Sequence, residues 1–363
     1  MYSIIPAFSC PHPARFHTAY VTYVLPGTGI RNPLTITANI GNRLYSNSVL
    51  KNTGALDQSK RTMAILSNVV IVGASGNLGG PVLSTLLADS SLNVTILARP
   101  ESSILSSPPA GAKIVTADFS DKAAVAAALK GVDALLLTVG APAIQGQIPL
   151  IDAAVEAGVK RVIPAEFGSN LGNEKTAALP VFAGKVEVRK YLEKLAAEGK
   201  TSWTAIFNGA FLDWGIKVGF LGVNVKEKSA KLYDGGERYF STSLLSDVAK
   251  AVVGVLKHPE ETKNKMIYVY SARLKQKVLV AAYEKALGIK LEVTEVSTEA
   301  LEKASYDKIA KGDLQGFTDQ IVRALLGEGY GGDFGLYEDS NELFGIKQVS
   351  EAELEEIIKA NAQ

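Results

Sequence analysis

From about residue 66 onward, the chain alternates short apolar segments with amphipathic ones. The apolar segments are rich in β-branched residues and run without polar interruption, which is typical of strands buried on both faces of a parallel sheet. Between them, apolar residues recur every three or four positions, as on helices that cover such a sheet. The pattern predicts a doubly wound α/β fold with a smaller, helix-rich C-terminal lobe.

The alternation predicts the positions of individual elements. Ser120 and Asp121 are expected to cap a helix that ends at Leu129, and Ser350 with Glu353 has the spacing of a capping box. Residues 278–328 are expected to be rich in helix. We expect strands at 69–72, 93–97, 113–116, 134–138, 161–164, 203–207 and 266–270, and further helices at 81–89, 148–157, 179–197, 243–256 and 350–360.

A glycine-rich turn, Gly73-Ala-Ser-Gly-Asn-Leu-Gly79, joins the first strand to its helix. Glycine has no Cβ, so the chain can turn sharply and a phosphate can approach the backbone. The helix that follows offers unpaired N–H groups and the positive end of its dipole to an anion. The G-x-x-G-x-x-G spacing is one residue longer than the usual dinucleotide motif. It predicts a Rossmann-like dinucleotide site; the alternative is a purely structural turn.

Polar residues at the strand ends indicate which dinucleotide is bound. Arg99 ends the second strand, where enzymes that use NAD carry an acid for the ribose 2′-hydroxyl. A guanidinium there would pair with the 2′-phosphate of NADP, and since the acid is missing we favour NADP(H) over a merely solvated arginine. Asp118 is expected beside the adenine or, alternatively, forms the turn before Ser120. Thr138 and Gly140 end the fourth strand, where the loop passes the ribose and pyrophosphate.

Lys185 is the strongest candidate for chemistry. It lies in the middle of the apolar face of the 179–197 helix, which is formed by Val181, Val188, Leu192 and Ala196. A lysine directed into a core must be paired or lose proton affinity, and the second case produces a general acid or base near neutral pH. The alternative is a lysine that reaches solvent from the helix end.

The sequence lacks the residues that tyrosine-based, metal-dependent or thiol-based catalysis would require. The helix carries no Tyr-x-x-x-Lys, because Tyr191 and Lys194 are one residue too close, which argues against the tyrosine-based mechanism of short-chain dehydrogenases. Cys10 is the only cysteine, and two of the three histidines lie before residue 63, so we expect no metal site and no thiol nucleophile.

Residues 1–62 differ from the rest of the chain. They carry six Lys/Arg against one acid, so the remainder is slightly acidic and lacks the basic surface of a nucleic-acid binder. They contain five prolines and no periodic pattern. We interpret them as a disordered or dispensable extension of a cytoplasmic protein; a mitochondrial transit peptide is the alternative. No apolar run reaches the roughly 18 residues that a membrane span needs.

Four segments together resemble the isoflavone reductase-like, NmrA-like branch of the atypical short-chain dehydrogenases, in a fungal-type variant. They are the glycine turn 73–79, Arg161-Val-Ile-Pro-Ala-Glu-Phe-Gly168, residues 182–193 around Lys185, and Trp203-Thr-Ala-Ile-Phe-Asn-Gly-Ala-Phe-Leu-Asp-Trp214. The resemblance covers residues 66–270, and the branch includes phenylcoumaran benzylic ether and pinoresinol–lariciresinol reductases. Ala165 departs from it, since the plant reductases carry serine there.

The resemblance implies an NADPH-dependent reductase of an aromatic or conjugated small molecule. Lys185 matches the family's active-site lysine, which relays a proton, orients the substrate or contacts the cofactor, and Arg99 would bind the 2′-phosphate. Phe167 would flank the nicotinamide and contact the substrate. The residues implied at the pyrophosphate are Gly73, Ser75, Gly76, Asn77, Leu78 and Gly79, and those implied along the substrate wall are Asn208, Gly209, Phe211 and Trp214.

The sequence therefore favours an enzyme with a dinucleotide domain at 63–215, to which 243–271 return, and a substrate lobe at 216–242 and 272–363. The alternative is an NmrA-like redox sensor that binds NADP(H) and a regulatory protein partner without turnover. We expect a small aromatic substrate, no nucleic acid or membrane partner, and a homodimer as one assembly.

Overall fold

A computed structural model describes residues 65–362 of the 363-residue chain. The expectations for the extension at 1–62 fall outside the described residues. Across 65–362, no helix has both the length and the apolar character required to cross a bilayer.

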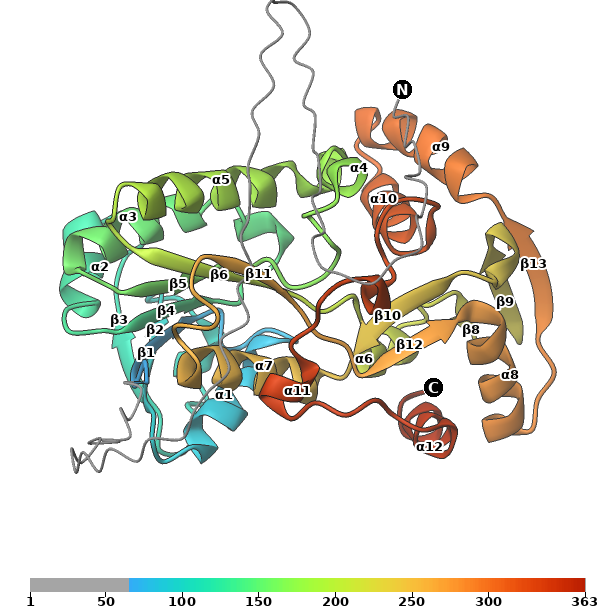
Figure 1. Ribbon diagram of the computed structural model, residues 1–363, viewed down its shortest axis with the longest axis horizontal. Coiled ribbons are helices and arrows are strands. Elements are labelled where there is room, and N and C mark those ends of the chain that lie inside the picture. The colour runs from blue at the N-terminus through green and yellow to red at the C-terminus, as the bar shows by residue number, and fades with distance from the viewer. Residues whose placement is uncertain (1–64, 363) are drawn as a thin grey trace, which may run out of the picture. The chain divides into compact units, whose positions relative to one another are not determined.

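Within the described residues, seven parallel strands form the central sheet, in the order β11-β6-β5-β4-β1-β2-β3 (Figure 1). The predicted doubly wound sheet is thus confirmed, and the late strand expected at 266–270 pairs with β6. The strands are β1 (Asn68–Val72), β2 (Asn93–Ala98), β3 (Lys113–Thr116), β4 (Ala134–Leu137), β5 (Arg161–Ile163), β6 (Ser202–Phe207) and β11 (Lys265–Tyr268).

Helices cover both faces of this sheet, as Figure 1 shows. Val70 and Val72 pack into the core on one face, and Val69 and Ile71 pack into the core on the other. Successive positions of β1 are apolar because side chains alternate between two buried faces. One face carries α2 (Lys122–Ala128), α3 (Gln147–Ala157) and α5 (Ala183–Ala197), and the other carries α1 (Gly79–Ala88) and α7 (Leu245–Lys257).

Residues beyond β6 add two small three-stranded sheets that the sequence did not predict. Their strands are short, and β13 is exposed along most of its length, so no apolar alternation marks them. One sheet contains β7 (Ala210–Phe211), β10 (Tyr239–Ser243) and β12 (Ala272–Lys275), and the other contains β8 (Val223–Asn224), β9 (Ser229–Tyr233) and β13 (Glu292–Val296). The remaining helices are α4 (Glu174–Ala177), α6 (Leu212–Lys217), α8 (Gln276–Leu287), α9 (Thr298–Ala310), α10 (Gln315–Leu326), α11 (Asn341–Phe344) and α12 (Glu351–Asn361).

Local chemistry decides several helix ends. The Asp121 carboxylate accepts a hydrogen bond from the Ala124 N–H at 3.0 Å and caps α2, so of the two predicted cap residues Asp121 is the one that acts. The capping box of Ser350 and Glu353 is confirmed at α12. The helix expected at 179–197 starts as a short 3₁₀ turn at Pro180–Phe182 before α5 begins.

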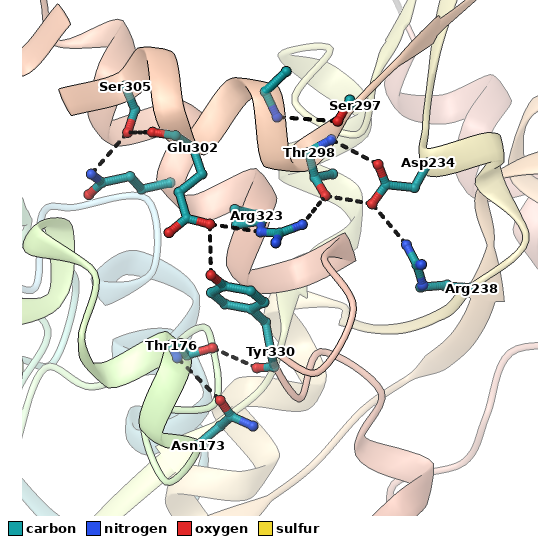
Figure 2. Close-up of polar contacts among 12 residues, drawn as sticks. Asn173, Thr176, Asp234, Arg238, Ser297, Thr298, Glu302, Ser305, Arg323 and Tyr330 are labelled. Carbon is teal, nitrogen blue, oxygen red and sulfur yellow. Dashed lines mark hydrogen bonds and ion pairs between the residues drawn. The ribbon is translucent and has the colours of Figure 1, made fainter. Parts of the chain in front are cut away.

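A chain of polar contacts joins the loop after β5 to the C-terminal helices (Figure 2). The Thr176 hydroxyl of α4 donates to the carbonyl oxygen of Tyr330 at 2.6 Å. The Tyr330 hydroxyl in turn donates to the Glu302 carboxylate on α9 at 2.7 Å, and Arg323 of α10 donates to the same oxygen at 2.9 Å. The glycine-rich turn at 327–332 is therefore held between α4 and α9.

Candidate active site at the carboxyl ends of the strands

The loop between β1 and α1 is wound so tightly that two of its positions require glycine. Gly73 has a φ of +88°, and a Cβ there would lie 2.9 Å from the carbonyl carbon and oxygen of Thr138. A Cβ on Gly79 would lie 2.0 Å from the carbonyl oxygen of Gly73. The N–H of Gly76 closes the turn by donating to that same oxygen at 3.1 Å. The loop thus has the compact form that the glycine spacing predicts.

The outer side of this loop presents free backbone donors. Ser75, Gly76 and Asn77 are exposed, and α1 starts after Leu78 without a side-chain cap. The N–H groups of Ser75, Asn77 and Leu78 form no hydrogen bond to any described residue. Such donors at the positive end of a ten-residue helix suit a diphosphate, so the residues present fit the pyrophosphate of a dinucleotide.

A hollow of about 540 Å³ lies beside the loop, lined by Ala74 and Ser75, by the outer face of α1 and by residues 103–110. It extends along α1 to Leu87 and Ala88 and includes neither Arg99 nor Lys185, so it is not assigned to the reacting substrate or to the 2′-phosphate. Arg99 follows β2, with a side chain that is 61% exposed and a guanidinium 3.2 Å from the Glu101 carboxylate. Its pairing with a 2′-phosphate stays a prediction.

The other predicted cofactor contacts have structural partners within the fold. The Asp118 carboxylate accepts the Ser120 N–H at 2.9 Å, a hydrogen bond that lowers the pKa of Asp118, so the turn-forming interpretation is confirmed. The Thr138 hydroxyl donates to the carbonyl oxygen of Val72 at 2.9 Å, which holds the ends of β1 and β4 together. Gly140 is exposed in an extended conformation that any residue can adopt. Contacts of these three residues with a cofactor stay predictions.

Lys185 turns inward from the first turn of α5. Its ammonium nitrogen donates to the carbonyl oxygens of Glu166 at 2.6 Å and of Phe167 at 3.2 Å, both in the loop that follows β5. The inward orientation predicted from the apolar face is therefore confirmed. Burial lowers the pKa of Lys185, and the Glu166 carboxylate partly offsets that effect. An ammonium group has three donors, so one is left for a ligand.

Two charged residues next to Lys185 were not predicted. Glu166 is 1% exposed, and neither of its carboxylate oxygens has a hydrogen-bond partner among residues 65–362. Burial raises the pKa of Glu166 to about 7, against the opposing charges of Lys185 and Arg189. Arg189, one turn after Lys185 on α5, is also buried. Two sequence features could have identified these residues: Glu166 is an acid within the apolar segment 162–167, and Arg189 is a base four residues after Lys185.

The loops after β5 and β6 are joined by backbone hydrogen bonds. The N–H groups of Asn208 and Gly209 donate to the carbonyl oxygen of Gly168 at 3.2 and 3.0 Å. Gly209 has a φ of +64°, and a Cβ there would lie 1.9 Å from the carbonyl oxygen of Ser241, so this crossing also needs glycine. The Asn208 side chain is buried, and its carbonyl oxygen Oδ1 has no partner within the described part of the chain. These contacts bring Asn208 and Gly209 to the loop that holds Lys185.

The three aromatic residues predicted at the site do not form one cluster around Lys185. Phe167 is 7% exposed, and its ring packs into the core on the α1 and α7 face, so its carbonyl rather than its ring contacts Lys185. Phe211 and Trp214 are half-buried and lie on the next elements, β7 and α6. The Trp214 ring packs against Phe220, with ring centroids 6.3 Å apart. In the described part of the chain, no group of three His, Cys, Asp or Glu side chains is placed to hold a metal ion.

Comparisons with known proteins match this arrangement. A family model described as "NmrA-like family" matches residues 66–321. The chain belongs to the NmrA-like family. A curated relative, "Oxidoreductase aprR" of Aspergillus flavus, is 34% identical to this family member over 77% of this chain and 94% of the relative. "Bifunctional pinoresinol-lariciresinol reductase 2" of Linum usitatissimum is 30% identical over 66% of this chain and 77% of the relative.

A solved structure described as "AtPrR2 with NADP+ and (+)pinoresinol" has a TM-score of 0.68 and 25% identity, and the match covers 81% of this chain and 98% of that one. Leucoanthocyanidin reductase from Vitis vinifera, solved with NADPH, shares the fold with a TM-score of 0.67, 23% identity and coverage of 80% and 99%. The predicted membership of the isoflavone reductase-like, NmrA-like group is confirmed, and this family member is an oxidoreductase of the atypical short-chain dehydrogenase type.

Proposed function

We propose that this protein is an NADPH-dependent reductase of a small aromatic or conjugated molecule. The observation that carries the proposal is the position of Lys185. Two carbonyl oxygens of the loop after β5 fix its ammonium group where the carboxyl ends of the strands meet, and ligands of doubly wound sheets bind at those ends. A pinoresinol-lariciresinol reductase is among its relatives, and a solved structure of the same fold holds NADP+ and (+)pinoresinol, which supports an aromatic substrate here.

The cofactor is NADP(H). The free amides of Ser75, Asn77 and Leu78 would bind its pyrophosphate, and Gly73, Gly76 and Gly79 keep the loop close enough for that contact. Arg99 would exchange its exposed pairing with Glu101 for the 2′-phosphate, because a doubly charged phosphate attracts a guanidinium more strongly than one carboxylate does. When bound, the cofactor supplies the hydride.

Lys185 would hold the substrate oxygen or donate a proton to it through its remaining N–H. Its lowered pKa makes its proton easier to transfer, and its fixed ammonium restricts where the substrate oxygen can lie. The unpartnered Oδ1 of Asn208 is a second polar atom in the adjoining loop. Phe211 and Trp214 would form the outer part of the substrate wall.

Turnover measurements test the proposal. The purified protein would be incubated with NADPH and a panel of aryl enones, flavonoids, lignans and quinones while the cofactor absorbance is followed. We expect oxidation with at least one class, and a loss of roughly 100-fold or more in kcat for Lys185→Ala, in the range typical of a lost proton-transfer group. Lys190→Ala is the matched control, since Lys190 is exposed on the same helix and should retain activity.

Cofactor selectivity is tested separately from turnover. Arg99→Asp should weaken NADPH binding by roughly 10-fold or more while NADH binding changes little, because NADH lacks the 2′-phosphate. Glu101→Gln, which removes the competing carboxylate, should leave NADPH binding equal or tighter. Equal losses for both nucleotides in Arg99→Asp would refute the assigned role. Tight NADPH binding without oxidation of any compound in a broad panel would instead favour the redox-sensor alternative.

A further inference from the structure

A small cluster of charged side chains lies between the loop after β5 and the first turns of α5. Its members are Glu166 and Arg189, which are buried, and Lys185, which is half-buried. Lys185 and Arg189 are four residues apart and therefore lie on the same face of the helix. The proposed function assigns a role to Lys185 alone, and leaves a fully buried carboxylate and a buried guanidinium without one.

The covalent structure places the Glu166 carboxylate near the lysine. The carbonyl oxygen that accepts the 2.6 Å hydrogen bond from the Lys185 ammonium belongs to Glu166 itself, so one residue carries both that acceptor and the buried carboxylate. Both Glu166 oxygens, and the Arg189 nitrogens Nε and Nη1, are buried without a hydrogen-bond partner among residues 65–362. A buried carboxylate with no donor of its own depends on nearby cations for its stability.

One further charged group faces this cluster, and the others near the helix are paired elsewhere. On α5 itself, Glu193 is half-exposed and lies 3.5 Å from Arg189. On the neighbouring elements, Asp152 of α3 accepts a hydrogen bond from Tyr191, Tyr268 of β11 donates to Asn170 at 3.0 Å, and Asp319 of α10 is paired with Lys308 at 2.6 Å. Glu166 is thus the buried anion of this cluster, and Arg189 is its second cation, which also pairs with the half-exposed Glu193.

We infer that Glu166 is a positioning residue that keeps Lys185 protonated. The inference deepens the proposed function and rests on the role given there to Lys185. Without the anion, a buried ammonium faces a buried guanidinium, and its proton is released at lower pH because like charges destabilise one another. Since burial raises the pKa of Glu166 to about 7, the support that it gives to Lys185 itself changes near neutral pH.

The experiment is an NMR titration of the full chain carrying lysine labelled with ¹³C at Cε, with the Lys185 signal assigned by its loss in Lys185→Arg. The midpoint of the Lys185 titration would be measured in the wild type and in Glu166→Gln. We expect the midpoint to fall by about one pH unit or more in Glu166→Gln, the size of effect that a close charge partner produces. Glu166→Asp, which keeps the charge, should restore most of the difference.

Glu187→Gln is the matched control, since it removes the same charge two residues from Lys185 on the exposed side of α5, where water screens it. Arg189→Met should move the midpoint in the opposite direction, and it carries the test if Glu166→Gln does not fold. An unchanged midpoint in folded Glu166→Gln, or in Arg189→Met, or an equal shift in Glu187→Gln, would overturn the inference.

The titration separates this inference from the proposed function because it requires no turnover. A lowered midpoint in a protein that reduces no compound would retain the charge relation and reject the reductase. Turnover that depends on Lys185, together with an unshifted midpoint in Glu166→Gln, would support the reductase and reject the role inferred for Glu166. A merely structural role for Glu166 would alter thermal stability without moving the midpoint in opposite directions for Glu166→Gln and Arg189→Met.

Discussion

The adjacent glycines Gly79 and Gly80 give a sharp test of the dinucleotide loop, because the same substitution has opposite surroundings at the two positions. A Cβ on Gly79 would lie 2.0 Å from the carbonyl oxygen of Gly73, whereas real Cβ atoms stay at least 3.0 Å from such atoms. The loop must therefore open by about 1 Å in Gly79→Ala. On Gly80, the nearest atom to a Cβ would be the carbonyl oxygen of Ala74 at 4.0 Å, so alanine fits without movement.

The magnitude follows from the donors that such an opening displaces. Each hydrogen bond from a backbone amide to a charged group contributes about 1.5–3 kcal/mol. Loss of one of them at the pyrophosphate would weaken NADPH binding by roughly 10- to 100-fold. The crowding itself should cost about 1–3 kcal/mol of folding free energy. Gly80→Ala should bind NADPH normally and gain up to about 1 kcal/mol of stability, because alanine is the better helix former.

The assay is a titration of NADPH followed by its fluorescence, together with thermal unfolding of both variants with and without the nucleotide. A ligand that binds the folded state raises the unfolding temperature, so Gly79→Ala should lose most of the rise that Gly80→Ala and the wild type show. Equal affinity and equal unfolding temperatures for the two variants would refute the reasoning, since they would mean that the loop neither needs this glycine nor binds the phosphates.

Three further predictions concern stability. Glu166 keeps its proton up to about pH 7 in the folded state but only up to about pH 4.5 in the unfolded state, so this group makes the wild type lose stability as pH rises between those values. The stability of Glu166→Gln relative to wild type should therefore increase by about 1–3 kcal/mol between pH 5 and pH 8. A difference in unfolding temperature that stays constant over this pH range would contradict the prediction. Tyr330→Phe removes the 2.7 Å hydrogen bond to Glu302 and should cost about 1–2 kcal/mol in a urea unfolding curve, whereas Tyr306→Phe, at a tyrosine that is 47% exposed, should cost less than about 0.5 kcal/mol. Asp121→Ala should cost about 1 kcal/mol by removing the cap of α2, and a loss as large from Ser120→Ala would show that the cap has been placed on the wrong residue.

Local patterns in the sequence determined the central sheet and the dinucleotide loop. Buried parallel strands are apolar at every position, and a tight turn before a helix requires glycine, so both features are visible in a short stretch of chain. The inward position of Lys185 was equally predictable, because a helix has one apolar face and Lys185 lies on it. The short exposed strands of the two small sheets left no such pattern, and only pairing with distant segments forms them.

Tertiary structure alone decided what surrounds Lys185. Its partners are backbone carbonyls, which every residue carries and no sequence pattern can single out. The buried state of Glu166 arises as α5 packs against the loop after β5, and the two segments are separated along the chain. The charge of a carboxylate depends on how much water and how many cations lie around it, and these are set only when the distant segments pack together.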